Sequence, residues 1–105
     1  MEFGTVFRMR PRQGQEDAVV EMLRRWDRER GPKVEGFMAS YLFQSQLHPG
    51  ELVGVAVFDS EEHYRKNAAD PEQDRWYRQL RDLLESDPEW NDGTVLIAEM
   101  GRTRM

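Results

Sequence analysis

One segment, Leu52–Phe58, restricts the possible folds of this chain more than any other. Its sequence, Leu-Val-Gly-Val-Ala-Val-Phe, predicts a β-strand whose two faces are both apolar. Val53, Val55 and Val57 point to one side, and Leu52, Ala56 and Phe58 point to the other. An antiparallel strand with one face in water would alternate apolar and polar residues. Both faces of this strand must therefore be covered in the assembled protein.

The size and composition of the chain limit it to a few classes of protein. A length of 105 residues predicts a single domain over residues 1–105 that can bury a modest core. The absence of cysteine excludes disulfides and thiolate chemistry. The formal net charge of −5, without a purely basic face, argues against nucleic-acid binding. No apolar run approaches the roughly 18 residues of a membrane span, and the first residues do not resemble a signal peptide, so we expect a cytoplasmic protein without membrane contact.

The first half of the chain predicts a strand, a helix and a β-hairpin. Residues 5–10 alternate apolar and polar side chains as a strand does. Residues 15–30 predict a helix, because the apolar residues fall on one helical face: Ala18, Val19, Met22, Leu23 and Trp26. A second strand is expected at 36–47. The tight turn predicted at 48–51, with Pro49 and Gly50 at its centre, then leads into Leu52–Phe58.

The second half predicts two helices and a last strand. Asp59 with Glu62 fits a capping box, so a short helix is expected to begin at residue 59 or 60. Asp70-Pro71 is a second start signal, which predicts a break near residue 69 and a longer helix to about residue 85. A turn at 91–93 and a strand at 94–100 complete the pattern.

The order strand, helix, strand, strand, helix, strand predicts an α+β protein of the ferredoxin-like βαββαβ type. In this arrangement both helices cover one face of a four-stranded antiparallel sheet, and the first and third strands lie in its middle. The central strand Leu52–Phe58 is apolar on its second face as well, which the helices cannot cover. We therefore expect a homodimer in which two sheets pack through their open faces as a dimeric α/β barrel.

The strand Leu52–Phe58, the segment Asp59-Ser60-Glu61-Glu62 after it and the later segment Asn67-Ala68-Ala69-Asp70-Pro71 resemble the antibiotic biosynthesis monooxygenase family of dimeric α/β-barrel proteins. The similarity extends loosely over residues 5–100. The resemblance implies the ferredoxin-like fold, the dimer and one of several activities. Members include cofactor-independent oxygenases of aromatic polyketides, a quinol oxygenase, haem-degrading enzymes and many proteins without a known activity.

Two positions depart from the family pattern. Phe58 stands where many members carry Trp, and Asn67 stands where many carry His on the following helix. Haem-degrading members use a helix His as the axial ligand of iron, and an amide coordinates iron poorly. His63, one turn earlier, would serve only a shifted haem. The resemblance therefore implies a protein that works without a cofactor.

The resemblance also places a small-molecule cavity between the helices and the sheet. The substrate-binding candidates for this cavity are aromatic: Tyr41, Phe58, Tyr64, Trp76 and Tyr77. His63 is a candidate catalytic base because its ordinary pKa lies near neutrality, and Asn67 is a candidate for orienting a phenolate or carbonyl. Three of these candidates have a simpler alternative role. His63 would be an exposed histidine in the first turn of a helix, Asn67 would end a short helix, and Trp76 would pack in the core.

Other site chemistries have no support in the sequence. The two histidines do not form a His-Glu-x-x-His pattern, so no metal site is predicted, and no Gly-rich phosphate loop or Gly-x-Ser-x-Gly motif occurs. Two functions therefore remain open. The first is a cofactor-independent monooxygenase acting on a small polycyclic phenol or quinol-like substrate. The second is a non-catalytic dimeric barrel that binds a small hydrophobic ligand.

Overall fold

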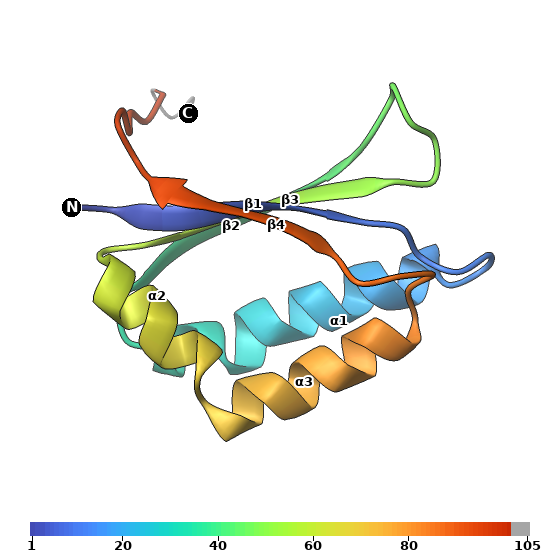
Figure 1. Ribbon diagram of the computed structural model, residues 1–105, viewed down its shortest axis with the longest axis horizontal. Coiled ribbons are helices and arrows are strands. Elements are labelled where there is room, and N and C mark those ends of the chain that lie inside the picture. The colour runs from blue at the N-terminus through green and yellow to red at the C-terminus, as the bar shows by residue number, and fades with distance from the viewer. Residues whose placement is uncertain (102–105) are drawn as a thin grey trace, which may run out of the picture.

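A computed structural model describes residues 1–101 of the chain. Its strands, β1 (Phe3–Met9), β2 (Phe37–Gln44), β3 (Leu52–Phe58) and β4 (Glu89–Thr94), form one antiparallel sheet in the order β2-β3-β1-β4. Helices α1 (Glu16–Glu29), α2 (Glu61–Ala68) and α3 (Pro71–Asp82) all lie on one side of this sheet (Figure 1). The ferredoxin-like α+β prediction is confirmed, with the first and third strands in the middle.

The helices are held to the sheet by an apolar core. The side chains that are almost completely buried come from both layers: Met9, Val19, Leu52, Leu80 and Leu84. Helix α1 contributes the predicted apolar stripe and is followed by a short 3-10 turn, η1 (Gly31–Lys33), that contains Pro32. No helix within residues 1–101 is long and apolar enough to cross a membrane.

The starts of the two later helices differ in how well they follow the sequence signals. Asp70 caps α3 by accepting a hydrogen bond from the backbone N–H of Glu72, with Pro71 in the first turn as predicted. The predicted cap at Asp59 is wrong, because Ser60 caps α2 by accepting from the backbone N–H of His63. Asp59 lies one residue too early for that role, and its carboxylate contacts the His63 ring instead.

The last strand lies at Glu89–Thr94, so the prediction of a strand at 94–100 is wrong. Directly after α3, the backbone N–H of Glu85 donates to the carbonyl of Arg10, which brings the chain alongside the end of β1. Strand β4 then pairs along β1 until Thr94 lies opposite Phe3, where β1 begins. The backbone N–H of Val95 still donates to the carbonyl of Glu2, just before β1, and the apolar residues after Val95 have no further length of β1 to pair with. The predicted turn at 91–93 is also wrong, because these residues are part of β4.

The second face of the sheet carries an apolar surface that the described part of the chain leaves uncovered. In β3, Val53, Val55 and Val57 face this side and alternate with the helix-facing positions. Their cross-strand neighbours include Val6, Tyr41 and Phe43, which are 43%, 64% and 56% exposed. We name these six residues the open face. The two apolar faces predicted for Leu52–Phe58 are thus present, and the helices cover only one of them.

Candidate ligand-binding cavity

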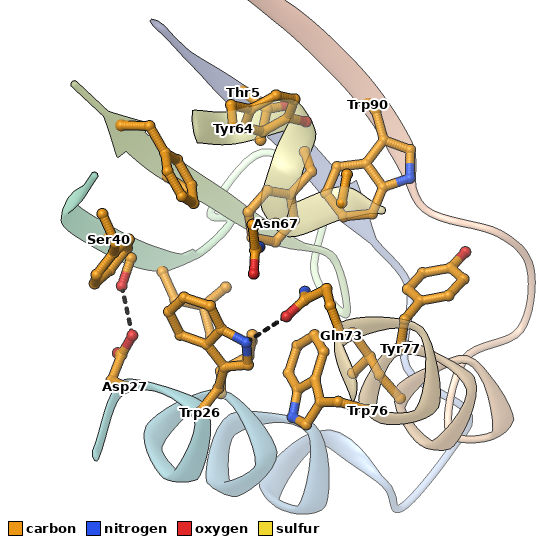
Figure 2. A pocket seen from close by; sticks show the side chains of 18 of the residues that line it. Thr5, Trp26, Asp27, Ser40, Tyr64, Asn67, Gln73, Trp76, Tyr77 and Trp90 are labelled. Atoms are coloured by element: carbon orange, nitrogen blue, oxygen red, sulfur yellow. Dashed lines mark hydrogen bonds between the residues drawn. The ribbon is translucent and has the colours of Figure 1, made fainter. Parts of the chain in front are cut away.

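A cavity of about 540 Å³ lies between the helices and the covered face of the sheet. Figure 2 shows side chains from α1, α2, α3 and the strands pointing into it. Its volume falls within the range of small-molecule sites, which is roughly 300–1,000 Å³. Its lining brings together aromatic and polar side chains from all three helices.

The floor of the cavity is one row of small or polar side chains that crosses all four strands. Ser40 on β2 lies opposite Ala56 on β3, Ala56 lies opposite Thr5 on β1, and Thr5 lies opposite Asp92 on β4. Directly opposed residues in an antiparallel sheet point to the same face. These short side chains leave space where larger ones would fill the core, so this row accounts for the cavity.

Aromatic side chains form the walls on either side of this row. One neighbouring row carries Phe37 and Phe58, and the other carries Phe7 and Trp90, whose ring centroids are 5.1 Å apart. Two helical tryptophans face the sheet across the cavity: Trp26 on α1, which meets Phe37 edge to face at 4.9 Å, and Trp76 on α3. A flat apolar ligand would find aromatic surfaces on several sides.

One end of the cavity offers hydrogen-bond donors. Gln73 accepts a hydrogen bond from the indole Nε1 of Trp26 at 2.7 Å through its Oε1 (Figure 2). Asn67 accepts one from Arg30 at 3.3 Å through its Oδ1. The amide nitrogens of both side chains are then the atoms left to meet a ligand. The indole Nε1 of Trp76 is buried without a partner among the described residues. We name Asn67 and Gln73 the donor end.

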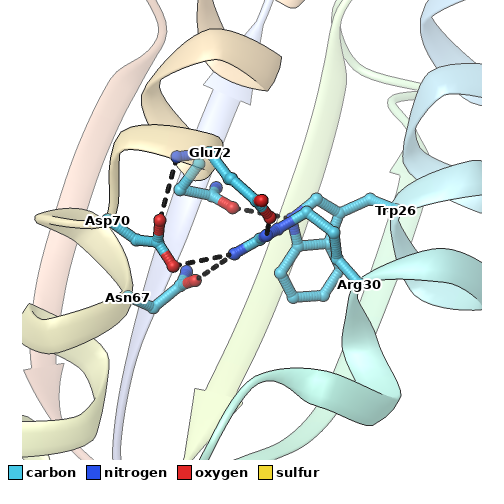
Figure 3. A network of polar contacts seen from close by, with 6 residues as sticks. Trp26, Arg30, Asn67, Asp70 and Glu72 are labelled. Carbon is cyan, nitrogen blue, oxygen red and sulfur yellow. Dashed lines mark hydrogen bonds and ion pairs between the residues drawn. The ribbon is translucent and has the colours of Figure 1, made fainter.

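An ion-pair network fixes the position of Asn67. The Arg30 guanidinium lies 2.8 Å from a Glu72 carboxylate oxygen and 3.5 Å from one of Asp70, in addition to its bond to Asn67 (Figure 3). The Arg30 side chain is only 18% exposed. Because Asp70 also caps α3, this single arginine joins the end of α1 to the junction between α2 and α3.

The opposite end of the cavity presents an acceptor. The Tyr64 hydroxyl donates to Asp92 Oδ1 at 2.9 Å, and Arg65 lies 3.1 Å from Asp92 Oδ2. Burial, together with the bond to Asp92, raises the pKa of Tyr64 to about 12. Burial alone would raise the pKa of Asp92, but the hydrogen bonds that it accepts outweigh this effect and lower it. Beside this pair the Thr5 side chain is buried, and its hydroxyl is one of the groups whose hydrogen bonds lower the pKa of Asp92. We name Thr5, Tyr64 and Asp92 the acceptor end.

His63 lies outside the side chains that line the cavity. Its ring is held between two carboxylates, with Nδ1 2.6 Å from Asp59 and Nε2 2.8 Å from Glu35. The hydrogen bond to Asp59, followed by the charges of both carboxylates, raises the pKa of His63 above 6.5. Within residues 1–101 no group of His, Asp and Glu side chains is arranged to hold a metal ion.

The structure brings most of the predicted site residues together. Five of them line the cavity from inside: Phe58, Tyr64, Asn67, Trp76 and Tyr77. Tyr41 borders the cavity but pairs with Val55 in the sheet register, so its side chain belongs to the open face. The sequence reasoning missed the polar members Thr5, Gln73 and Asp92. Their partners come from distant segments, and only the sheet register, which the sequence pattern does not give, places Thr5 beside Asp92.

The fold and the site define a class of protein: a ferredoxin-like α+β domain with an aromatic-walled cavity between its sheet and its helices. Residues 3–79 match the family described as antibiotic biosynthesis monooxygenase, and the chain belongs to that family. The resemblance noted from the sequence is therefore confirmed. No curated protein is significantly similar to the chain in sequence.

Solved structures share the fold at low sequence identity. A cofactor-independent oxygenase from Streptomyces nogalater is 18% identical with a TM-score of 0.78, over 92% of this chain and 95% of its own. A protein from Mycobacterium tuberculosis is 18% identical with a TM-score of 0.79, over 95% of this chain and 100% of its own. A protein of unknown function from Nitrosomonas europaea is 17% identical with a TM-score of 0.76, over 97% of this chain and 96% of its own.

Proposed function

We propose that this protein is a cofactor-independent monooxygenase that acts on a small, flat aromatic substrate of the phenol or quinol type. The observation that carries the proposal is the cavity of about 540 Å³ with aromatic walls, hydrogen-bond donors at one end and an acceptor at the other. Family membership and the likeness to an oxygenase of known cofactor independence support it.

The donor end suits the chemistry of such a reaction. A substrate that has lost a proton transfers electrons to O₂, one oxygen atom enters the product, and the other leaves as water; anthrone would become anthraquinone in this way. The negative charge that develops on the substrate oxygen needs donors already in place. The amide nitrogens of Asn67 and Gln73 would supply them. The role of His63 as the base stays a prediction, and its place between two carboxylates gives it no contact with the cavity.

Oxygen uptake tests this proposal. Purified protein is mixed with a panel of anthrones and quinols, and uptake is followed with an oxygen electrode while ¹⁸O₂ labelling identifies the product. We expect catalysed uptake for at least one substrate and a loss of at least about tenfold in Asn67→Ala. His48→Ala, at an exposed residue outside the cavity lining, serves as the control and should match the wild type. Uptake no faster than the uncatalysed rate across the panel would reject the monooxygenase.

A second candidate is a non-catalytic protein that binds a small hydrophobic ligand. It is favoured by the absence of His, Lys or Cys among the described residues that line the cavity, which leaves few groups for proton transfer. Native mass spectrometry of protein from its natural host would distinguish the two. A retained aromatic molecule that survives incubation with oxygen unchanged supports binding, whereas its conversion to an oxygenated product supports catalysis.

We also propose that the protein is a homodimer that joins two sheets through the open face. Val6, Tyr41 and Phe43 are all substantially exposed there, and Leu96 and Ile97 beyond β4 are 85% and 81% exposed. A monomer would leave this apolar surface in water, which is unfavourable. Val55→Glu, at the centre of the open face, should convert a dimer to a monomer in light scattering. A monomeric wild-type protein at micromolar concentration would refute the dimer.

A further inference from the structure

Each amide of the donor end receives a hydrogen bond on its oxygen from a residue at the end of helix α1. We propose that these two residues, Trp26 and Arg30, are positioning residues that hold the Gln73 and Asn67 amides with their nitrogens toward the ligand. The donor end then selects a ligand oxygen that accepts hydrogen bonds, such as a ketone carbonyl or a phenolate. This inference rests on the proposed function, since it assigns the part of the ligand that binds at this end of the cavity.

The helix itself places both residues for this role. Trp26 and Arg30 are four residues apart, so they lie one turn from each other on the same face of the helix. Arg30 follows directly after α1 and keeps a right-handed helical backbone conformation. The Trp26 Nε1 donates to Gln73 Oε1 at 2.7 Å. The Arg30 Nη2 donates to Asn67 Oδ1 at 3.3 Å.

Both donors are fixed in position and in kind. The Trp26 side chain is buried, and its ring meets Phe37 edge to face with the centroids 4.9 Å apart. Figure 3 shows the Arg30 guanidinium between the two carboxylates that hold it, Asp70 and Glu72. An indole N–H and a guanidinium can donate hydrogen bonds but accept none. Each amide can therefore meet its α1 partner only through its oxygen.

Rotation of either amide by half a turn would be unfavourable. A reversed Gln73 would place its amide nitrogen against the Trp26 N–H, and a reversed Asn67 would place its own against the cationic Arg30. In each case a hydrogen bond would be lost and two donors would face each other. Gln73 and Asn67 line the cavity and are only partly buried, so their amide nitrogens are left for a ligand.

Three flat tricyclic probes of similar shape test this polarity: 9-fluorenone offers an acceptor oxygen, carbazole offers an N–H donor, and fluorene offers neither. Their affinities are measured by equilibrium dialysis against the full chain. We expect 9-fluorenone to bind about tenfold or more tightly than fluorene, as for two hydrogen bonds, and more tightly than carbazole. Equal affinities for 9-fluorenone and fluorene would overturn the inference while leaving the aromatic cavity of the proposed function intact. Failure of all three to bind would overturn the proposed aromatic ligand, and the inference with it.

Trp26→Phe removes the indole N–H and keeps an aromatic ring. It should reduce the preference for 9-fluorenone over fluorene by about threefold and strengthen carbazole relative to fluorene, because the Gln73 amide is then able to rotate. In a Gln73→Ala background, Trp26→Phe should leave the remaining preference unchanged, because Trp26 acts through Gln73. Fluorene binding reports the shape of the cavity alone. Equal weakening of fluorene and 9-fluorenone by Trp26→Phe would show that Trp26 only packs, and would overturn its positioning role.

Arg30 is tested in the same way. Arg30→Met removes the donor to Asn67 and should reduce the preference for 9-fluorenone over fluorene by about threefold, whereas Arg30→Lys, which keeps a cationic donor, should retain most of it. Arg28→Met provides the matched control, because Arg28 lies on the same helix, pairs with Glu21 and is 60% exposed. It should keep the wild-type preference. An unchanged preference in Arg30→Met, or an equal reduction in Arg28→Met, would overturn the role of Arg30.

Discussion

Filling the cavity from its floor should stabilise the protein, although enlarging a buried side chain usually destabilises one. Ala56 lies in the middle of the cavity floor, between Ser40 and Thr5. In a close-packed core, Ala→Leu would force neighbouring side chains apart at a typical cost of about 1–3 kcal/mol. In Ala56→Leu the added carbons enter open space of about 540 Å³ instead. The sign of the change in stability therefore reports whether the cavity is open.

The magnitude follows from the carbons that are buried. Leucine adds three carbon atoms to alanine, each contributing about 0.8 kcal/mol when it leaves water. About 0.5–1 kcal/mol is lost because the side chain is fixed in one rotamer. The net stabilisation is then about 1–2 kcal/mol, equivalent to a rise in melting temperature of about 4 °C or more for a domain of this size. The same substitution should weaken binding of the proposed aromatic ligand, since the leucine side chain takes up part of the cavity.

A matched control lies two residues away on the same face of β3. Gly54 is covered by the Phe7 ring, and a Cβ atom at this position would overlap with ring atoms of Phe7. Gly54→Ala adds only one carbon but should destabilise the protein, whereas Ala56→Leu adds three and should stabilise it. Thermal and urea unfolding at equal protein concentrations compare the two, because the stability of a dimer depends on concentration. Destabilisation by Ala56→Leu of more than about 1 kcal/mol would refute an open cavity.

Two polar clusters give further predictions. Asp59 and Glu35 raise the pKa of His63 above 6.5. The contribution of protonated His63 to stability is therefore full below pH 6.5 and is lost as the pH rises through the raised pKa. His63→Gln should remove this loss of stability at alkaline pH, as measured by melting temperatures from about pH 5 to about pH 9. A melting temperature of His63→Gln that depends on pH as the wild type does would contradict this prediction. Arg30→Gln should lower the free energy of unfolding by about 1–2 kcal/mol, because it leaves a half-buried network without its cation. Arg78→Gln removes a largely exposed ion pair and should lower the free energy of unfolding, measured by urea titration, by less than about 0.5 kcal/mol. Equal losses in Arg30→Gln and Arg78→Gln would refute the special role of the Arg30 network.

Sequence periodicity was sufficient for the elements that carry their own local signals. The one-sided apolar spacing of α1, the Asp70-Pro71 start of α3 and the doubly apolar β3 all depend on neighbouring residues, and all three are confirmed. Strand β4 has no such signal, since its sequence Glu-Trp-Asn-Asp-Gly-Thr resembles a turn. Its position is set by long-range pairing with β1, and the more apolar residues after it misled the prediction.

The candidate site was predictable in part for the same reason. The aromatic lining residues and Asn67 could be predicted from the family resemblance, because they lie on a strand and on helices whose positions the sequence predicts correctly. Thr5 and Asp92 become neighbours only when β1 pairs with β4 in one particular register. A shift by one residue would turn each side chain to the opposite face of the sheet. The acceptor end therefore needed three-dimensional information.

The core and the cavity occupy different parts of the sheet. The buried pair Met9 and Leu52 lies at one end of the β1–β3 ladder, against Leu80 and Leu84, whereas Thr5 and Ala56 lie further along the same strands. Substitutions in the cavity floor therefore change the size and polarity of the site without removing the contacts that hold the helices to the sheet. The proposed ligand would be selected by this row of side chains, and family membership alone does not determine it.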